Sequence, residues 1–194
     1  MRRVLALFAL AAVALAPLAS AAPTAGPESG SATQFRLTTR AGVYTVSLLA
    51  STPAAGGAPV LRMRLLSGAG DAKRFAGTLQ AGALVTRGGT TTLSTRLGSI
   101  PLRVAFHPQT PVVTVSFGNV DSDNEVAEGW AIAGSGGTAE VALGAVRCTV
   151  TLMATGTATV VDSGGYGRPL ATALGLPLKG ARCDDIPSTP LPIP

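Results

Sequence analysis

The chain has 194 residues, of which 46% are hydrophobic and only 4% aromatic, and its formal net charge is +5. So few aromatic side chains argue against nucleic-acid binding, in which rings commonly stack on bases. Glycine and proline are frequent, at 24 and 14 residues, without the regular spacing of collagen. Such a composition is typical of short strands joined by tight turns.

The first 21 residues have the three parts of a secretory signal peptide. Two arginines follow the initiator methionine, residues 4–16 are apolar, and small residues precede Ala22. The apolar run is too short to span a membrane, which takes about 20 residues. We therefore predict cleavage near Ala21–Ala22, a secreted or periplasmic protein, and no transmembrane segment in the mature chain.

The mature chain divides into three parts by composition. Residues 22–32 are small and polar and are expected to form a flexible leader. Residues 33–185 alternate between apolar and polar side chains and are long enough for one β-rich domain. Residues 186–194 contain four prolines and are expected to form an extended tail.

In chain order, the first half predicts a hairpin, a strand and a short helix. Residues 33–39 and 44–48 alternate on either side of a turn at Ala41–Gly42. Residues 61–65 form the clearest half-buried strand, with Arg62 and Arg64 directed to water. After Asp71, the spacing of Phe75 and Leu79 is compatible with one short helix.

The second half predicts further strands and one more short helix. A strand at residues 90–97 precedes a long hairpin of residues 102–106 and 113–117, turning at 107–111. A short strand at 130–133, a Gly/Ser turn at 134–137, strands at 139–143, 146–154 and 157–161, and a helix at 169–174 follow. Short strands with frequent turn signals indicate an all-β, antiparallel β-sandwich or barrel-like domain with at most one or two short helices.

The chain contains two cysteines, Cys148 and Cys183. Disulfides persist in the oxidising compartments that exported proteins reach. We therefore predict a Cys148–Cys183 disulfide. A catalytic thiol is the less favoured alternative, since the chain has one histidine and no CxxC motif.

The sharpest candidate site is the acidic segment that carries Asp121, Asp123 and Glu125, with Glu128 shortly after. Alternate carboxylates on a loop can converge on calcium, which takes six to eight oxygen ligands. The EF-hand pattern fails, because Val126 stands where it needs glycine. Asp, Ser and Asn also favour ordinary turns through side-chain to backbone hydrogen bonds, and that alternative stays open. No other cofactor is predicted.

His107 and Trp130 are the remaining candidates. His107 is the sole histidine, so a Ser-His-Asp or metal–histidine scheme would have to use it, although an exposed loop histidine is the simpler interpretation. No GxSxG motif is present. Trp130 follows the acidic segment and is a candidate ligand contact, with a core or capping aromatic as the alternative.

Charge is segregated along the sequence. Residues 22–120 carry nine basic and two acidic side chains, a net +7, whereas residues 121–194 carry four basic and eight acidic, a net −4. Such a split can produce a positive face that attracts an anionic envelope polymer or a protein partner. The sequence favours a non-enzymatic binding or structural domain at the cell envelope or surface. The alternative is a small secreted hydrolase using the Asp121–Glu128 segment.

Overall fold

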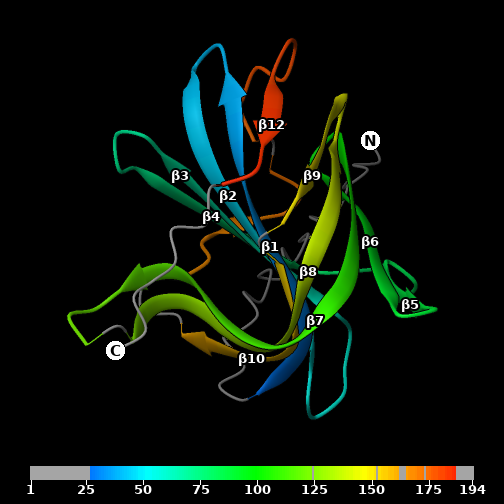
Figure 1. Ribbon diagram of the computed structural model, residues 1–194. Helices are drawn as coiled ribbons and strands as arrows, with labels where there is room; N and C mark the ends of the chain where they lie inside the picture. The colour runs from blue at the N-terminus through cyan, green and yellow to red at the C-terminus, as the bar shows by residue number, and fades with distance from the viewer. Residues whose placement is uncertain (1–26, 124, 152, 162–164, 173, 187–194) are drawn as a thin grey trace, which may run out of the picture.

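The computed structural model describes residues 27–123, 125–151, 153–161, 165–172 and 174–186. Among these residues the structure contains β-strands and no helix. The predicted all-β class is confirmed. Figure 1 labels the strands, which are β1 (Glu28–Thr39), β2 (Gly42–Pro53), β3 (Val60–Ser67), β4 (Ala72–Thr78), β5 (Leu84–Arg87), β6 (Thr90–Leu97), β7 (Ile100–Val120), β8 (Val126–Leu143), β9 (Val146–Val150), β10 (Met153–Val161), β11 (Arg168–Pro169) and β12 (Arg182–Asp184).

All of these strands belong to one sheet. Its order is β11-β4-β3-β2-β1-β10-β8-β7-β6-β5, with β12 attached to β1 and β9 attached to β8. All pairs are antiparallel except the short β11–β4 contact. The sheet forks beside β10, because β1 and β8 each leave β10 part-way along and continue with β12 and β9, respectively.

The predicted β1–β2 hairpin is present and longer than expected. Its ladder runs from Thr39 opposite Gly42 to Glu28 opposite Pro53. Residues 28–32, which the sequence assigned to the leader, therefore belong to the sheet. They pair with β10 on their other side, so the start of β1 lies in the interior of the sheet and not at its edge.

The long hairpin predicted at residues 102–117 is a wrong prediction. Residues 107–111 lie inside β7, and residues 134–137, predicted as a second turn, lie inside β8 directly opposite. Register shifts between Pro108 and Thr110 and between Thr110 and Val113 add residues to β7. Such bulges bend a strand, and glycines in the partner strand tolerate the bend. The turn signals therefore produce one bent two-stranded ribbon, whose chain reversal comes at residues 121–125.

The main hydrophobic core covers one face of β1 to β4. On that face, Phe35, Leu48 and Met63 are almost fully buried. Phe106 of β7 and Val141 of β8 come from beyond the bend and pack into the same cluster. Burial of these apolar side chains supplies the main driving force for folding.

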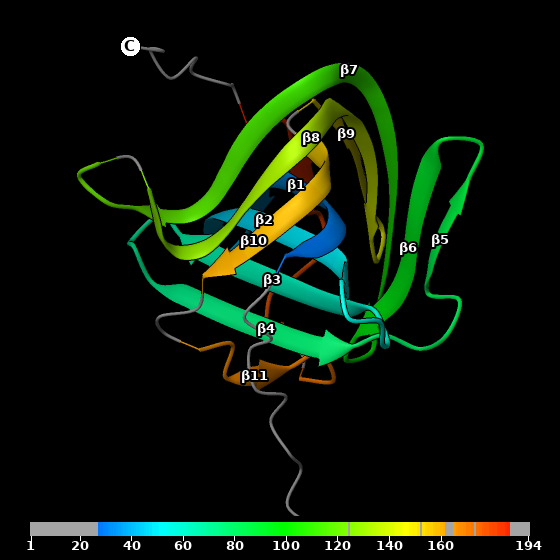
Figure 2. The same ribbon diagram turned by 90° about the horizontal axis from the view of Figure 1, so that it is seen from below.

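The opposite face of the same strands carries a smaller inner core, whose buried members are Ala32, Leu49, Phe117, Trp130, Ile132, Ala154 and Ala158. The sheet is curled around this face. Asn119 of β7 receives a hydrogen bond from Arg64 of β3, although five strand spacings, about 24 Å in a flat sheet, separate the two strands in sheet order. Figure 2 shows β7 and β8 arching beside β10, β1 and β2.

Small residues line the inside of this curl. A Cβ atom on Gly134 would lie 2.0 Å from the carbonyl oxygen of Thr155, and one on Gly156 would lie 2.1 Å from that of Ala133. β8 and β10 pair Gly134 directly with Gly156. The absent side chains therefore allow the backbones of these two strands to approach closely.

Both predicted short helices are wrong. Residues 72–78 form β4, in which Phe75 pairs with Met63 and enters the main core. Pairing with β3 outweighs a weak helical spacing that Gly77 already disfavoured. Residues 168–169 form β11, parallel to β4, in place of a helix starting at Pro169.

The predicted signal peptide, residues 1–21, lies outside the described residues, as does the tail from residue 187. Among the residues that are described, there is no helix with the length and apolar character needed to cross a membrane.

Candidate functional site

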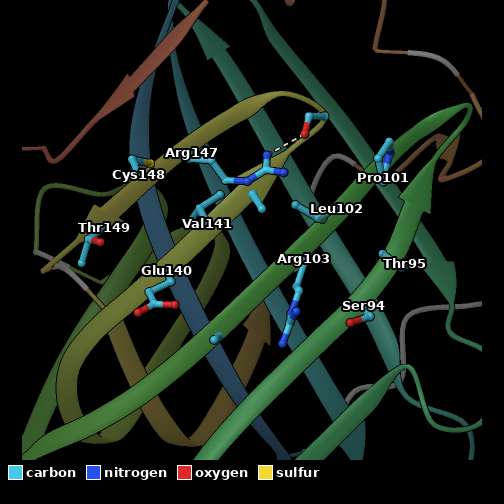
Figure 3. A pocket seen from close by; sticks show the side chains of 13 residues that line it. Ser94, Thr95, Pro101, Leu102, Arg103, Glu140, Val141, Arg147, Cys148 and Thr149 are labelled. Carbon is cyan, nitrogen blue, oxygen red and sulfur yellow. Dashed lines mark hydrogen bonds between the residues drawn. The ribbon is translucent and has the colours of Figure 1, made fainter.

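A groove of about 700 Å³ lies on the outward face of β6, β7, β8 and β9 (Figure 3). Strand alternation produces it, because Leu102, Val104 and Val141 are buried in the main core while their neighbours turn out. Leu102 and Val141 still border the groove. Its lining includes the small residues Ala105, Ala142 and Gly144. Polar side chains surround these small residues, namely Ser94, Thr95, Arg103, Glu140, Arg147 and Thr149.

The polar residues form two rows across the strands. In the first row Ser94 pairs with Arg103, Arg103 with Ala142, and Ala142 with Arg147. Two strand spacings separate the two arginines, which is about 10 Å. The second row places Glu140 between Ala105 and Thr149. Figure 3 shows Arg103 and Arg147 on opposite sides of the groove.

Arg147 is held by the chain, whereas Arg103 is not. The Nη1 of Arg147 donates hydrogen bonds to the carbonyl oxygens of Gly144, at 2.6 Å, and Val146, at 2.9 Å. Its Nε and Nη2 groups have no hydrogen-bond partner among the described residues. The Arg103 side chain has none within those residues either, so the groove presents guanidinium N–H groups to an incoming acceptor.

His107 lies on the same face as the groove. Its Nδ1 is 3.3 Å from the Thr90 hydroxyl oxygen, and its Nε2 is 3.9 Å from a carboxylate oxygen of Glu140. The second distance exceeds hydrogen-bond length. His107 thus connects a hydroxyl and a carboxylate only loosely, and it lies in β7, away from the turn where the sequence placed it.

The acidic segment forms the turn between β7 and β8. The Asp121 carboxylate accepts hydrogen bonds from the backbone N–H groups of Asp123, at 3.0 Å, and Glu125, at 2.8 Å. This is the side-chain to backbone bonding of ordinary turns. No group of three or more His, Cys, Asp or Glu side chains placed to hold a metal ion occurs in the described ranges. Calcium binding by Asp121, Asp123 and Glu125 therefore stays an untested prediction.

Trp130, the candidate ligand contact, is fully buried in the inner core. Its ring stacks on Tyr166 with a centroid separation of 6.0 Å and lies 6.1 Å from Phe117. Its Nε1 atom is buried and has no hydrogen-bond partner among the described residues. A contact between Trp130 and a ligand stays a prediction that the structure does not test.

Sequence reasoning missed an ion-pair cluster inside the curl. Arg62 and Arg64, predicted to face water, are each only 6% exposed. Arg62 binds both carboxylate oxygens of Glu28, at 2.7 and 3.0 Å, and the Ser51 hydroxyl donates to that carboxylate. Glu28 lies 34 residues from Arg62, so alternation within one strand gave no signal of the pairing.

The cluster continues along β3 and β4. Arg64 donates to Asn119 at 2.6 Å, Asn119 donates to Glu128 at 3.2 Å, and Arg74 forms an ion pair with Glu128. These contacts join β3 and β4 to the far end of the β7–β8 ribbon. We call the four residues Arg64, Arg74, Asn119 and Glu128 the clasp.

The predicted Cys148–Cys183 disulfide is confirmed, with the two Cα atoms 5.6 Å apart. It joins β9, which pairs with β8, to β12, which pairs with β1, and so ties together the two branches of the sheet that diverge at the fork. Cys148 also lines the groove. The disulfide therefore fixes one wall of the candidate site to β1 through β12.

Comparison with known proteins gives no family assignment: no family model, no curated protein and no solved structure matches this chain.

Proposed function

We propose that this protein is an exported, non-enzymatic β-domain that binds an anionic polymer of the cell envelope or surface along the groove. The observation that carries the proposal is the row Ser94–Arg103–Ala142–Arg147, in which two arginines with unpaired N–H groups flank a small residue. Guanidinium groups recognise carboxylate and phosphate groups through paired N–H donors.

The shape and chemistry of the groove fit a chain-like ligand. The backbones of Arg103 and Arg147 lie about 10 Å apart, so the two side chains can contact different anionic groups of one ligand chain. Ser94, Thr95 and Thr149 offer hydroxyl groups to its polar atoms. Glu140 provides one acceptor for a ligand hydroxyl. Pairing in the sheet fixes the backbone of these residues, which limits the entropy lost on binding.

Export is part of the same proposal and rests on the signal-peptide pattern of residues 1–21. The Cys148–Cys183 disulfide supports it, since such bonds persist in oxidising compartments. N-terminal sequencing of the protein recovered from its native cell tests this part. An N-terminus at Ala22 in an extracytoplasmic fraction is expected, and uncleaved protein in the cytoplasm would refute it.

The binding test compares the unmodified protein with an Arg103→Gln/Arg147→Gln double variant, using polygalacturonic acid as the anionic probe and dextran as the neutral one. We expect binding to the anionic probe only, weakening as salt rises. The double variant should bind about tenfold more weakly, because it loses two exposed charge contacts worth up to about 1 kcal/mol each in other proteins.

The matched control is Arg36→Gln/Arg40→Gln, which removes the same charge from exposed positions outside the groove. It should retain most of the affinity. Equal losses in the two double variants would mean that net charge alone drives binding, and the groove proposal would then fail. Thermal unfolding of each variant checks that its fold is retained.

A further inference from the structure

Positive charge exceeds negative charge in the clasp and the neighbouring Glu28–Arg62 pair. Glu28 neutralises Arg62 directly, and Glu128 forms an ion pair with Arg74. Arg64 has no carboxylate within ion-pair distance among the described residues and reaches only the neutral amide of Asn119. Its Nε atom is buried and has no hydrogen-bond partner in that part of the chain. Within the part of the chain that the structure describes, one buried cation is therefore left without an anion of its own.

The pKa of Arg64 is consistent with a buried charge that lacks a counter-ion. Burial lowers the pKa of its guanidinium, the charge of Arg74 lowers it further, and Tyr166 opposes the shift. Arginine nevertheless stays protonated at neutral pH. Buried charges in proteins are normally paired, so an anion near Arg64 and Arg74 would relieve an unfavourable charge.

A pocket of about 400 Å³ opens beside this cluster, between β4 and the segment that leads into β11. Arg74 pairs with Arg64 in the β3–β4 ladder and also lines the pocket. Lys73 and Arg168 line it as well, both exposed and without an ion-pair partner among the described residues. Ala72, Gly165 and Gly167 complete the lining, which includes no carboxylate among the described residues.

We propose that this pocket binds a phosphate-type oxyanion, with Lys73 and Arg168 as direct contacts and with Arg64 and Arg74 supplying positive charge from behind. The site lies on β4 and β11. Figure 2 shows that these two strands are separated from the groove strands β8 and β9. It does not depend on polymer binding at the groove. Free phosphate and a phosphomonoester end group on a larger molecule share this chemistry.

The test is calorimetric titration of the full mature protein with inorganic phosphate and, separately, with glycerol 3-phosphate. At least one of them should bind. Tighter binding of free phosphate identifies the free anion as the ligand, and tighter binding of the ester identifies a phosphoryl group carried by a larger molecule. No binding of either compound in low-salt buffer would overturn the proposal.

Three variants locate the site. Lys73→Gln/Arg168→Gln removes the exposed contacts and should weaken binding about tenfold, as expected for two lost contacts between exposed charges. Arg64→Gln should weaken binding by a smaller factor, since its charge acts from behind Arg74. Because Arg64→Gln changes a buried residue, its thermal unfolding without phosphate is measured alongside.

The Arg36→Gln/Arg40→Gln variant is the matched control. It also removes two positive charges, but from exposed positions outside both the pocket and the groove, and should leave phosphate affinity within about twofold, allowing for weak long-range electrostatics. An equal loss in this control, or unchanged affinity in Lys73→Gln/Arg168→Gln, would refute the assignment of the anion to this pocket.

Discussion

Glu28 illustrates how one residue near the expected start of the mature chain contributes to the interior. Its side chain is 1% exposed and binds Arg62 through both oxygens. A buried ion pair of this kind gives little net stability compared with apolar residues. Removing one partner is nevertheless destabilising, because it leaves the other charge buried without a counter-ion. The residue therefore constrains the sheet more than its position in the sequence suggests.

At this scale we predict that Glu28→Gln destabilises the protein by about 3–5 kcal/mol, because Arg62 would keep its buried charge without a counter-ion. Urea unfolding followed by circular dichroism measures the change. Glu125→Gln, at an exposed turn position, is the control and should change stability by less than about 0.5 kcal/mol. A loss in Glu28→Gln no larger than in this control would contradict the role assigned to Glu28.

The positions of the strands were easier to predict from the sequence than the contacts between strands that are distant in the sheet. Phe35, Leu37, Leu61 and Met63 alternate with polar neighbours, and the structure buries them as that alternation indicates. Alternation could not show that Arg62 and Arg64 are buried as well. Their partners Glu28 and Asn119 come from distant strands, and only the curl of the sheet brings them together.

The bend in the β7–β8 ribbon was missed for a local reason. The prolines and glycines at 107–111 and 134–137 are the residues that also form chain reversals. Nothing in either segment alone indicates that the two lie opposite each other. The groove was missed in the same way, since its rows combine residues from four strands. The disulfide, in contrast, could be predicted because the chain has two cysteines and its first residues predict export.

The close approach of β8 and β10 on the inside of the curl can be tested by adding a side chain at Gly134. Gly134→Ala should destabilise the protein by at least about 1–3 kcal/mol, the usual cost of overpacking, because its Cβ would lie 2.0 Å from the Thr155 carbonyl oxygen. Gly68→Ala is the control, since a Cβ there meets only the Val43 carbonyl oxygen at 3.8 Å. Chemical unfolding of both variants measures the difference, and equal stability would argue against the close approach of β8 and β10.

The fork gives a second prediction at the element scale. Replacing both Cys148 and Cys183 by serine should cost about 3–4 kcal/mol on the chain-entropy account of disulfides, with 35 residues of sequence separation between them. Calorimetric unfolding of the variant against the oxidised protein measures this cost. Unchanged stability would mean that β9 and β12 stay in place without the bond.

For the whole molecule, the two cores share their strands. β1, β2, β7 and β8 each contribute side chains to both clusters, so neither core can unfold and leave the other intact. Folding also brings acidic residues of the second half of the sequence next to basic residues of the first half. Glu128 from the acidic half forms an ion pair with Arg74, and Glu140 lies in the same groove as Arg103.

We therefore predict a single cooperative transition. Trp130 is the chain's one tryptophan and lies in the inner core, so its fluorescence reports that core alone. Far-ultraviolet circular dichroism reports the whole sheet. The two probes should give the same midpoint in urea, as two-state unfolding requires. Separate midpoints would show that the inner core unfolds independently of the main core.

The position of β1 in the sheet also sets when folding can finish. This first strand pairs with β10 and β12, which come from the end of the described chain. A growing chain therefore cannot complete the hydrogen bonds of its first strand until nearly all of it has been synthesised. Pairing between such distant segments slows folding. Slow folding would favour the proposed export, because the chain would stay unfolded for longer after synthesis.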